Sequence, residues 1–553
     1  MMRKVCRYTL ILITILLILG CSKNISGGES KSKEKYYLAS DSSKVDLLDE
    51  NYEKDKEVYR GEVVELIKKG DDYYKVKYDG DEYYIKKEYL SKEEENLVLE
   101  KELYVRTSLN LYKDKDSSSL IGLIKKGNKV EITGYDKLND DGSVNKYKVK
   151  YNNIEGYVRA KYLVKTLDEA NKKYDYNDSL KVHEKMGSSL GGGNALELDY
   201  YPYEKANFKD NVMPKETRTL YINSSAIANV DDYIEFAKSN NINAFVVDIK
   251  DNTQPAYPAN AMKKYSPTNY EKAINTYDDY KKYIQKLKDN NFYVIGRITV
   301  FKDSYFVKDH SEVAIKDSAT GNPFSHNGSY WPSAFNRLVW EYNVELAKES
   351  AKEIGFNEIQ FDYVRFPDQT MRLEASKKID MSNTYDESKA QALQTFVMYA
   401  TDELHELNTY VSIDVFGESV HDYVTAYGQY WPALSNIVDV ISGMPYPDHF
   451  NPYQYGFKEV VWTNPYKLLE YWGSLVAEKQ KLIPTPAKVR TWIQVYDVFK
   501  TPSVKYDSSK VSDQIDGLYA NGLKDGYMTW NSNSSLVKYK EVSEAFKKER
   551  VYE

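Results

Sequence analysis

The stretch Glu358-Ile359-Gln360-Phe361-Asp362 decides the fold of the larger part of this 553-residue chain. Its first four residues read as a short buried strand, and an acid follows where the strand ends. Seven similar runs lie on either side of it: 220–222, 244–247, 293–296, 411–413, 438–441, 490–495 and 526–528. Each run is short and mostly apolar, as are the strands of a parallel sheet that is buried on both faces.

Segments with helical periodicity separate these runs. They are 230–238, 277–287, 339–353, 390–407, 465–479 and 511–520, and 542–548 closes the chain. Eight strands that alternate with helices predict an α/β fold, a closed (β/α)8 TIM barrel over residues 217–553. An open doubly wound sheet is the competing architecture. The count of eight, and a sequence without a glycine-rich nucleotide loop, disfavour it.

Polar residues that directly follow the runs are the candidate site, because active sites of such barrels lie at the C-terminal ends of the strands. Those predicted to bind substrate are Asp248, Lys250, Asp251, Arg297, Arg365, Tyr446, Asp448, His449, Gln494, Trp530 and Asn531. For Asp248 and Asp251, bracing of Lys250 is an equal alternative. Asn223 and Asp303 also follow strand-like runs, and Trp331, Trp492 and Trp530 are candidates for stacking on sugar faces. For Trp492, which lies inside its run, a place in the core is an equal alternative.

Asp362 and Asp414 are the predicted catalytic pair, since they end the fourth and fifth strands. Cleavage of a glycosidic bond uses two carboxyl groups, and a separation of about 5–6 Å is typical of retention through a covalent intermediate. Arg365 is expected to keep Asp362 ionised. The alternative is a structural Asp–Arg ion pair at a strand end.

Six segments carry a resemblance: Val246-Val247-Asp248-Ile249-Lys250-Asp251, Trp340-Glu341-Tyr342-Asn343, 360–367, Ser412-Ile413-Asp414-Val415-Phe416-Gly417, Trp492-Ile493-Gln494 and Thr529-Trp530-Asn531. Together they resemble a family of bacterial glycosyl hydrolases of unknown function, over about residues 218–550. That family looks related to α-glycosidase-like barrels, whose nucleophile follows the fourth strand. The resemblance therefore implies that Asp362 is the nucleophile.

The acid/base has three candidates. Asp414 lies in the fifth-strand motif, Glu418 follows Gly417 as a catalytic Glu does in amylase-like barrels, and Asp448 follows the sixth strand, as the acid does in galactosidase-like barrels. Asp448 stands where the family is expected to have a small residue, so the resemblance does not support a role for it. Asp414 is favoured, then Asp448.

Two segments before the barrel repeat each other about 72 residues apart. Tyr74-Lys75-Val76-Lys77-Tyr78 matches Tyr147-Lys148-Val149-Lys150-Tyr151, and similar strand-like runs flank both. They predict two small all-β domains, 36–92 and 100–165, and the second resembles bacterial SH3-like domains. The first lacks the usual opening strand. Cell-wall or glycan binding and a spacer without a ligand remain equal alternatives. The glycine-rich segment 166–216 is predicted to be a linker.

The N-terminus predicts export. Arg3, Lys4 and Arg7 precede a short apolar run, and Ile18-Leu19-Gly20-Cys21 resembles the bacterial lipobox. Residues 1–20 are thus expected to be a signal peptide, Cys21 the lipidated residue and 21–35 a tether, which would place the protein on the outer face of the cell membrane. An uncleaved membrane anchor is the weaker alternative.

Charge and composition limit the partners. A net charge of −7 argues against nucleic acid, and six scattered His with two Cys predict neither a metal site nor a cofactor. The main hypothesis is a cell-surface, retaining glycoside hydrolase that acts on a poly- or oligosaccharide. The alternatives are a glycan-binding lipoprotein with a degenerate barrel, or another envelope chemistry such as deacetylation.

Overall fold

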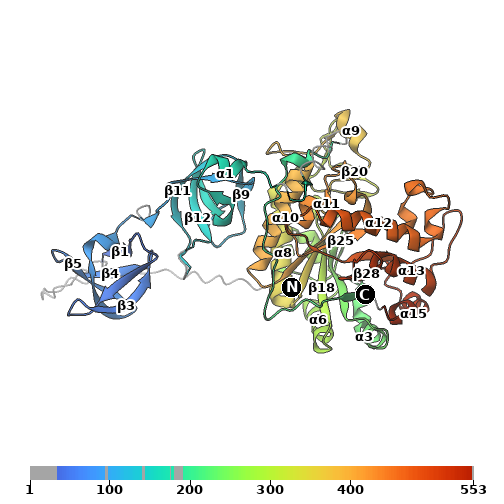
Figure 1. Ribbon diagram of the computed structural model, residues 1–553, viewed down its shortest axis with the longest axis horizontal. Coiled ribbons are helices and arrows are strands. Elements are labelled where there is room, and N and C mark those ends of the chain that lie inside the picture. The colour runs from blue at the N-terminus through green and yellow to red at the C-terminus, as the bar shows by residue number, and fades with distance from the viewer. Residues whose placement is uncertain (1–33, 94–96, 140–142, 175, 180–190, 551–553) are drawn as a thin grey trace, which may run out of the picture. The chain divides into compact units, whose positions relative to one another are not determined.

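The computed structural model describes residues 34–93, 97–139, 143–174, 176–179 and 191–550. These residues form two compact units that divide between Leu97 and Val98 (Figure 1). The predicted signal peptide 1–20, Cys21 and most of the tether 21–35 lie outside the described residues. Within the described part of the chain, no helix combines the length and the apolar character needed to cross a membrane.

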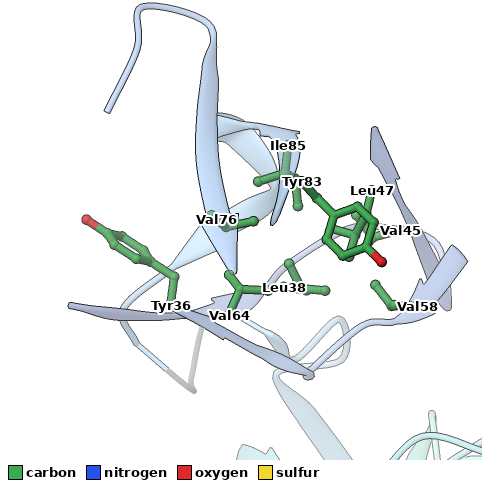
Figure 2. Close-up of a cluster of buried hydrophobic side chains, with 9 residues drawn as sticks. All are labelled: Tyr36, Leu38, Val45, Leu47, Val58, Val64, Val76, Tyr83 and Ile85. Carbon is green, nitrogen blue, oxygen red and sulfur yellow. The ribbon is translucent and has the colours of Figure 1, made fainter. Parts of the chain in front are cut away.

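The first unit is an antiparallel sheet of seven strands in the order β3-β2-β6-β5-β4-β1-β7. The strands are β1 (Lys35–Leu38), β2 (Lys44–Leu48), β3 (Lys54–Tyr59), β4 (Val63–Lys68), β5 (Tyr73–Tyr78), β6 (Asp81–Lys86) and β7 (Leu90–Ser91). Alternate residues of the strands face inward and form one small core, in which Leu38, Val64 and Ile85 are fully buried (Figure 2). The alternation in the sequence therefore becomes a single buried face.

The second antiparallel sheet repeats the first, in the order β10-β9-β13-β12-β11-β8-β14. Its strands are β8 (Glu102–Val105), β9 (Leu109–Tyr112), β10 (Leu120–Ile124), β11 (Lys129–Tyr135), β12 (Lys146–Tyr151), β13 (Ile154–Arg159) and β14 (Leu163–Val164). In each copy a two-residue turn with positive φ joins two strands into a hairpin: Asp79-Gly80 between β5 and β6, and Asn152-Asn153 between β12 and β13. Such turns match the right-handed twist of the strands.

One expectation about the first copy was wrong. It has an opening strand, β1, which pairs with β4 as β8 pairs with β11. β1 begins with the charged Lys35 and the polar Tyr36, so it does not stand out as an apolar run in the sequence. The SH3-like identity of both sheets stays a prediction.

The second unit also contains a parallel sheet in the order β26-β25-β24-β22-β18-β16-β15-β28-β27. The strands are β15 (Thr217–Ile222), β16 (Ala244–Asp251), β18 (Tyr293–Thr299), β22 (Glu358–Asp362), β24 (Tyr410–Phe416), β25 (Val440–Met444), β26 (Lys488–Val489), β27 (Thr491–Gln494) and β28 (Gly526–Trp530). Only Arg490 separates β26 from β27, and its backbone N–H donates to the carbonyl of Ile441 in β25 at 3.2 Å. The sheet is therefore a nearly closed barrel, and each of the eight predicted runs contributes to it.

Helices surround this sheet (Figure 1). The longer ones are α3 (Val230–Ser239), α6 (Tyr277–Asp289), α8 (Arg337–Glu349), α10 (Lys389–His405), α12 (Pro465–Gln480) and α13 (Ser508–Tyr519). The short ones are α4 (Asn260–Tyr265), α5 (Pro267–Glu271), α7 (Ser304–Asp309), α9 (Met371–Ala375), α11 (Trp431–Ser435), α14 (Leu536–Glu541) and α15 (Ser543–Lys547), whereas α1 (Leu167–Asn171) packs on β8 and β14 of the second antiparallel sheet. A capping box of Ser388 and Gln391 begins α10, which fixes where this predicted helix starts. Short strand pairs in the loops complete the fold: β17 (Gln254–Pro255) on β16, β19 (Lys316–Asp317) with β23 (Ile379–Asp380), and β20 (Ser325–His326) with β21 (Ser329–Tyr330).

The predicted linker 166–216 is not a free connection where it approaches the barrel. Ala206, Phe208 and Met213 are partly buried and pack against the barrel core beside Tyr293 and Tyr410, which begin β18 and β24. This segment therefore plugs the N-terminal end of the barrel. Its few apolar residues lack helix or strand periodicity, so sequence patterns did not reveal that they pack against the core.

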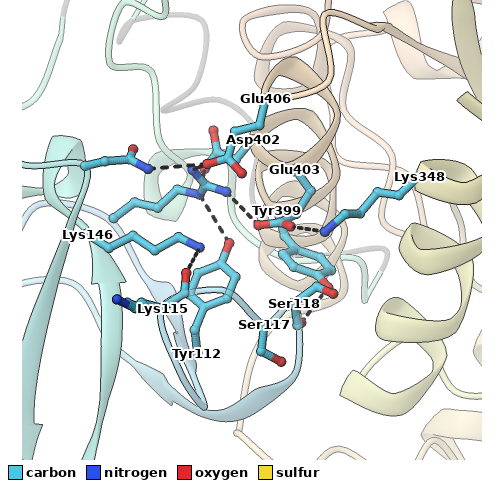
Figure 3. A network of polar contacts seen from close by, with 12 residues as sticks. Tyr112, Lys115, Ser117, Ser118, Lys146, Lys348, Tyr399, Asp402, Glu403 and Glu406 are labelled. Carbon is cyan, nitrogen blue, oxygen red and sulfur yellow. Dashed lines mark hydrogen bonds and ion pairs between the residues drawn. The ribbon is translucent and has the colours of Figure 1, made fainter. Parts of the chain in front are cut away.

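The second antiparallel sheet packs against α10 through a buried polar network (Figure 3). Arg159 at the end of β13 forms ion pairs of 2.6 Å with both Glu403 and Glu406. The hydroxyl of Tyr162 donates to Asp402 at 2.7 Å, and that of Tyr399 donates to the carbonyl of Ser118 at 2.7 Å. The sheet and the barrel therefore form one packed unit, because these groups are satisfied only when both parts are present.

Candidate functional site

Arg297 joins two acids at the C-terminal ends of three neighbouring strands. It lies on β18, between Asp248 of β16 and Asp362 of β22. Its Nη1 is 2.7 Å from Asp248 Oδ1, and its Nη2 is 2.6 Å from Asp362 Oδ2. The guanidinium is almost fully buried, so these two ion pairs act in a medium of low polarity. Arg297 thus places a positive charge directly beside Asp362.

Asp362 is held at its other oxygen by the backbone that follows it. The N–H of Tyr363 donates to Asp362 Oδ1 at 2.6 Å, and Tyr363 has a φ of +53°, which is rare for a bulky residue. The side chain of Asp362 keeps 9% of its surface exposed. The acid is therefore fixed in position but still reaches solvent.

Asp414 lies one strand further round, on β24. The register between β22 and β24 pairs Phe361 with Ile413, so Asp362 and Asp414 follow at the same level of the sheet. Asp414 Oδ1 accepts a hydrogen bond of 2.7 Å from Trp492 Nε1, and its Oδ2 has no partner among the described residues. Burial, and then the negative charge of Asp362, raise the pKa of Asp414 well above its ordinary value. Both causes favour the protonated form of Asp414.

Aromatic rings line the space beside these acids. Trp530 is part-exposed, and its ring lies 4.8 Å from that of Tyr221 and 6.3 Å from that of Tyr446, with which it is stacked. Trp492 meets it nearly at a right angle, at 5.6 Å. These rings come from β15, β27, β28 and the loop after β25. Tyr221, Trp492 and Tyr446 are buried in the barrel core, so Trp530 is the one of these four rings whose part-exposed face suits the apolar face of a sugar.

Tyr221 is a site residue that sequence reasoning missed. Its hydroxyl donates to Asp248 Oδ2 at 2.5 Å. Burial is the main cause that raises the pKa of Asp248, to about 6, and the charge of Arg297 opposes it. Tyr221 lies inside its strand-like run, whereas the predicted site residues directly follow their runs. Successive side chains of a strand point to opposite faces, and this alternation along β15 is the signal that could have identified Tyr221.

Arg365 was expected to act on Asp362, but the arginine that pairs with Asp362 is Arg297. Arg365 instead pairs with Asp368 at 3.1 Å and donates to the carbonyl of Phe366 at 3.1 Å. Its guanidinium lies 4.4 Å from the ring centroid of Phe416. The left-handed backbone at Tyr363 turns the chain after Asp362, and a sequence pattern does not show this.

Lys250 is separate from the acid pair. A bulge after Asp248 shifts the register of β16, and Lys250 forms a fully buried ion pair of 2.6 Å with Asp303 at the start of α7. Among the described residues, neither Asp248 nor Asp251 forms a hydrogen bond or an ion pair with Lys250, whose partner is Asp303. Asp251 keeps 32% of its side chain exposed and lies 3.9 Å from Arg297 Nη1, at the edge of the site.

The predicted residues after the sixth, seventh and eighth strands hold loops. Gln494 Oε1 accepts from the backbone N–H of Asp448 at 3.2 Å, and Asn531 Nδ2 donates to the carbonyl of Val495 at 3.1 Å. Asp448 Oδ1 accepts from the hydroxyl of Tyr496 at 2.8 Å. His449 is 59% exposed beside Tyr446, whose ring lies 5.1 Å away. Gln494 and Asn531 therefore support the rim rather than face an open site.

The other candidates lie further from the acid pair. Glu418 accepts hydrogen bonds from Tyr423 and Tyr427 at 2.9 and 2.8 Å. Asn223 caps the turn after β15, where its Oδ1 accepts from Ala226 N at 2.8 Å. Trp331 is buried against Tyr363. No group of three or more His, Cys, Asp or Glu side chains within the described ranges is arranged to hold a metal ion.

A barrel of parallel strands that brings carboxyl groups, an arginine and aromatic rings together at the C-terminal ends of its strands is the framework of a sugar-processing hydrolase. A family model described as "Putative glycosyl hydrolase domain" matches residues 219–536, which is more than half of the chain. The chain therefore belongs to this glycosyl hydrolase domain family. The resemblance noted from the six sequence segments is confirmed at this level.

Solved structures of other proteins are similar to parts of the chain. A hypothetical protein from Ruminiclostridium thermocellum is 29% identical over 35% of this chain and 97% of its own, with a TM-score of 0.30. The PgaB (BpsB) glycoside hydrolase domain from Bordetella bronchiseptica is 14% identical over 60% of this chain and 98% of its own, with a TM-score of 0.43. A chitobiase from Flavobacterium johnsoniae is 10% identical over 60% and 48%, with a TM-score of 0.39. No curated protein matches the chain.

Proposed function

We propose that this chain is a retaining glycoside hydrolase that cleaves a poly- or oligosaccharide, with Asp362 as nucleophile and Asp414 as acid/base. The observation that carries this proposal is the contrast between two neighbouring carboxyl groups. Asp362 lies 2.6 Å from the guanidinium of Arg297, whereas Asp414 forms no ion pair with a cation in the described residues and burial raises its pKa. Two carboxyl groups in such different environments can divide the roles of nucleophile and acid between them.

The reaction would proceed in two steps. Asp414 gives its proton to the oxygen of the leaving sugar while an oxygen of Asp362 bonds to the anomeric carbon, and the glycosidic C–O bond breaks. In the second step ionised Asp414 takes a proton from water, and the oxygen of that water replaces Asp362 at the anomeric carbon. Asp414 has no exposed surface, so in this mechanism the side chains that cover it move when the sugar binds.

The barrel that holds this pair is proposed to be of the (β/α)8 TIM type. In this assignment β26 and β27 are one strand, interrupted at Arg490. The eight strand positions then correspond to the eight predicted runs. The eight C-terminal strand ends would place Asp362 fourth and Asp414 fifth in chain order.

The direct test measures release of reducing sugar by the full chain from a panel of bacterial envelope polysaccharides and plant glycans. Asp362→Asn is expected to lower kcat by about 10³-fold or more, because it removes the nucleophile while keeping the shape of the side chain. Asp368→Asn is the matched control, since Asp368 pairs with Arg365 outside the acid pair.

Further variants separate the acid/base candidates. Azide added to Asp414→Ala is expected to restore turnover and to yield a glycosyl azide of retained configuration, whereas Asp448→Ala and Glu418→Ala are expected to keep activity. Rescue of Asp448→Ala instead would assign the acid to Asp448. Tight glycan binding by the wild-type chain, with no turnover of any glycan, would contradict the proposal and support a binding protein with a degenerate barrel.

We also propose that the protein is a lipoprotein on the outer face of the cell membrane, anchored through Cys21 and held at the cell wall by its antiparallel sheets. The sequence motif before Cys21 supports the anchor. Expression of the full chain in a bacterium fed labelled palmitate tests it: Cys21→Ser should lose the label and leave the membrane fraction. Labelling of the variant would contradict the assignment of Cys21.

A further inference from the structure

A cluster of aromatic side chains lies beyond the C-terminal ends of β24 and β25, outside the acid pair. We call it the rim platform, and it consists of His421, Tyr423, Phe450, Tyr455, Phe457 and Tyr471. The first two lie in the loop after β24, the next three in the loop after β25, and Tyr471 is on α12. Residues of three separate segments therefore converge on one surface.

Tyr455 is the centre of the rim platform. Its ring lies 4.6 Å from that of Tyr471, 5.8 Å from that of His421 and 5.9 Å from that of Phe450. Its hydroxyl lies 3.1 Å from His421 Nε2. The backbone of Tyr455 has a φ of +59°, a left-handed conformation that is unfavourable for a residue with a side chain. The surrounding contacts hold this ring in place against that cost.

The rim platform keeps part of its aromatic surface in water. Tyr471 is 41% exposed, and His421, Tyr423, Phe450, Tyr455 and Phe457 are all part-exposed. The rings carry polar groups at their edges, namely the tyrosine hydroxyls and the ring nitrogens of His421. Beside them, the hydroxyl of Tyr423 donates a hydrogen bond to Glu418. A surface of ring faces with polar edges matches a sugar, which has apolar C–H faces and hydroxyl groups around its edge.

The charges around the rim platform cancel locally. Asp422 forms an ion pair with Lys479, and Glu459 lies 3.6 Å from Lys467. Because Lys479 and Lys467 already have carboxylate partners, these two cations are poorly placed to attract a polyanion. The surface therefore fits uncharged sugar units better than uronic acids or a nucleic acid.

The rim platform is continuous with the acid pair. The ring of His449, which precedes Phe450, lies 5.1 Å from that of Tyr446. Tyr446 is buried, and the carboxyl groups of Asp414 and Asp362 are close enough to act on its hydroxyl. A glycan chain that lies over the exposed His449, beside Tyr446, would thus run from the acids to the rim platform.

From this arrangement we infer that the rim platform binds uncharged sugar units of the glycan whose bond is cleaved at Asp362, several units away from that bond. This inference rests on the proposed function, and it defines the substrate as an uncharged polysaccharide or long oligosaccharide rather than a short glycoside. Rings at a distance from the scissile bond contribute binding to the long chain alone.

The test uses the full chain carrying Asp362→Asn, so that binding is measured without turnover. Native gels containing galactomannan, xyloglucan, arabinoxylan, laminarin or pullulan report affinity as retardation of the protein. At least one of these polysaccharides is expected to retard it, and adding Tyr471→Ala should weaken that affinity about fivefold. Tyr453→Ala is the matched control, because Tyr453 is 62% exposed in the same loop and belongs to no ring pair of the platform.

Two results would overturn the inference, and both are separate from failure of the proposed function. Equal retardation of the Tyr471→Ala and Tyr453→Ala proteins would show that the rim platform does not bind glycan. Retardation by none of the five would exclude an uncharged glycan, even if the wild-type chain hydrolyses a charged one. Thermal unfolding of each variant checks that the fold is intact.

Discussion

At the scale of single residues, Arg297 organises the candidate site. It faces Asp248 on one neighbouring strand and Asp362 on the other, both within 2.7 Å. A buried arginine between two carboxylates is costly to desolvate and is stable only when both partners are present. The site is therefore a coupled set of charges, in which a change at one residue alters the protonation of the others.

The pH dependence of stability provides a test of Asp414. Its folded-state pKa is raised above the ordinary value of 3.8, so the stability that it contributes is fully present below about pH 3.8 and is lost as the pH rises towards the folded pKa. Asp414→Asn removes this loss. The free energy of unfolding of the variant, relative to that of the wild type, is expected to rise by about 1.4 kcal/mol for each pH unit above 3.8, until the folded pKa is reached.

Urea unfolding of both proteins between pH 4 and pH 8 measures this difference. Asp386→Asn is the surface control, because the carboxyl group of Asp386 is fully exposed. A constant difference between wild type and Asp414→Asn across this range would mean that Asp414 is ionised in the folded chain, which contradicts its role as proton donor.

The residues of the site were only partly predictable. Asp248, Arg297, Asp362 and Asp414 follow or end buried strands, and the fold brings them to one end of the barrel, where they were expected. The partner of Asp362 was not predictable, because sequence proximity favoured Arg365. Arg297 lies closer to Asp362 because their strands, β18 and β22, are neighbours in the parallel sheet. The left-handed turn at Tyr363 directs Arg365 elsewhere.

At the scale of elements, the seam between β28 and β15 depends on one glycine. Gly526 begins β28 with a φ of +119°, and a Cβ there would lie 2.0 Å from the carbonyl oxygen of Thr217. Gly526→Ala is therefore expected to force the strands apart and to lower the free energy of unfolding by more than the roughly 1–2 kcal/mol that left-handed backbone alone costs.

Gly522→Ala is the matched control for this prediction. Gly522 has a φ of +76°, but a Cβ there would meet nothing within 4 Å, so only the backbone cost applies. Denaturant unfolding followed by tryptophan fluorescence compares the two variants. Equal destabilisation would show that the strands adjust without cost.

The elements themselves were largely predictable, since period and length separate strands from helices. α6 begins at Tyr277, as predicted, after the capping residue Thr276. The strand β1 and the plug around Phe208 were not predicted, because each carries too few apolar residues to show the periodicity of a strand or a helix. Their burial follows from tertiary contacts alone.

At the scale of the whole molecule, the second antiparallel sheet and the barrel share a buried ion cluster. Arg159 pairs with Glu403 and Glu406 and lies 3.5 Å from Asp402, and its side chain is 5% exposed. Arg159→Met leaves these carboxyl groups without their buried partner, so it should destabilise the larger unit by about 3–5 kcal/mol. The first unit has its own core and should be unaffected.

Scanning calorimetry of the full chain tests this separation. The Arg159→Met protein should show one transition moved to lower temperature and a second transition unchanged. Lys165→Met is the control, since Lys165 forms an exposed ion pair with Glu100, of a kind that contributes little. Movement of both transitions together would contradict the division into two independent units.

The plug at the N-terminal end of the barrel also has a consequence for synthesis. The backbone of Phe208 bonds to the hydroxyl of Tyr410, which is 202 residues further along the chain. At about 5–20 residues per second, the ribosome adds Tyr410 roughly 10–40 s after Phe208. During that time Phe208 and its apolar neighbours have no complete barrel to enter. A chaperone that binds nascent chains would therefore find its target here, before β24 exists.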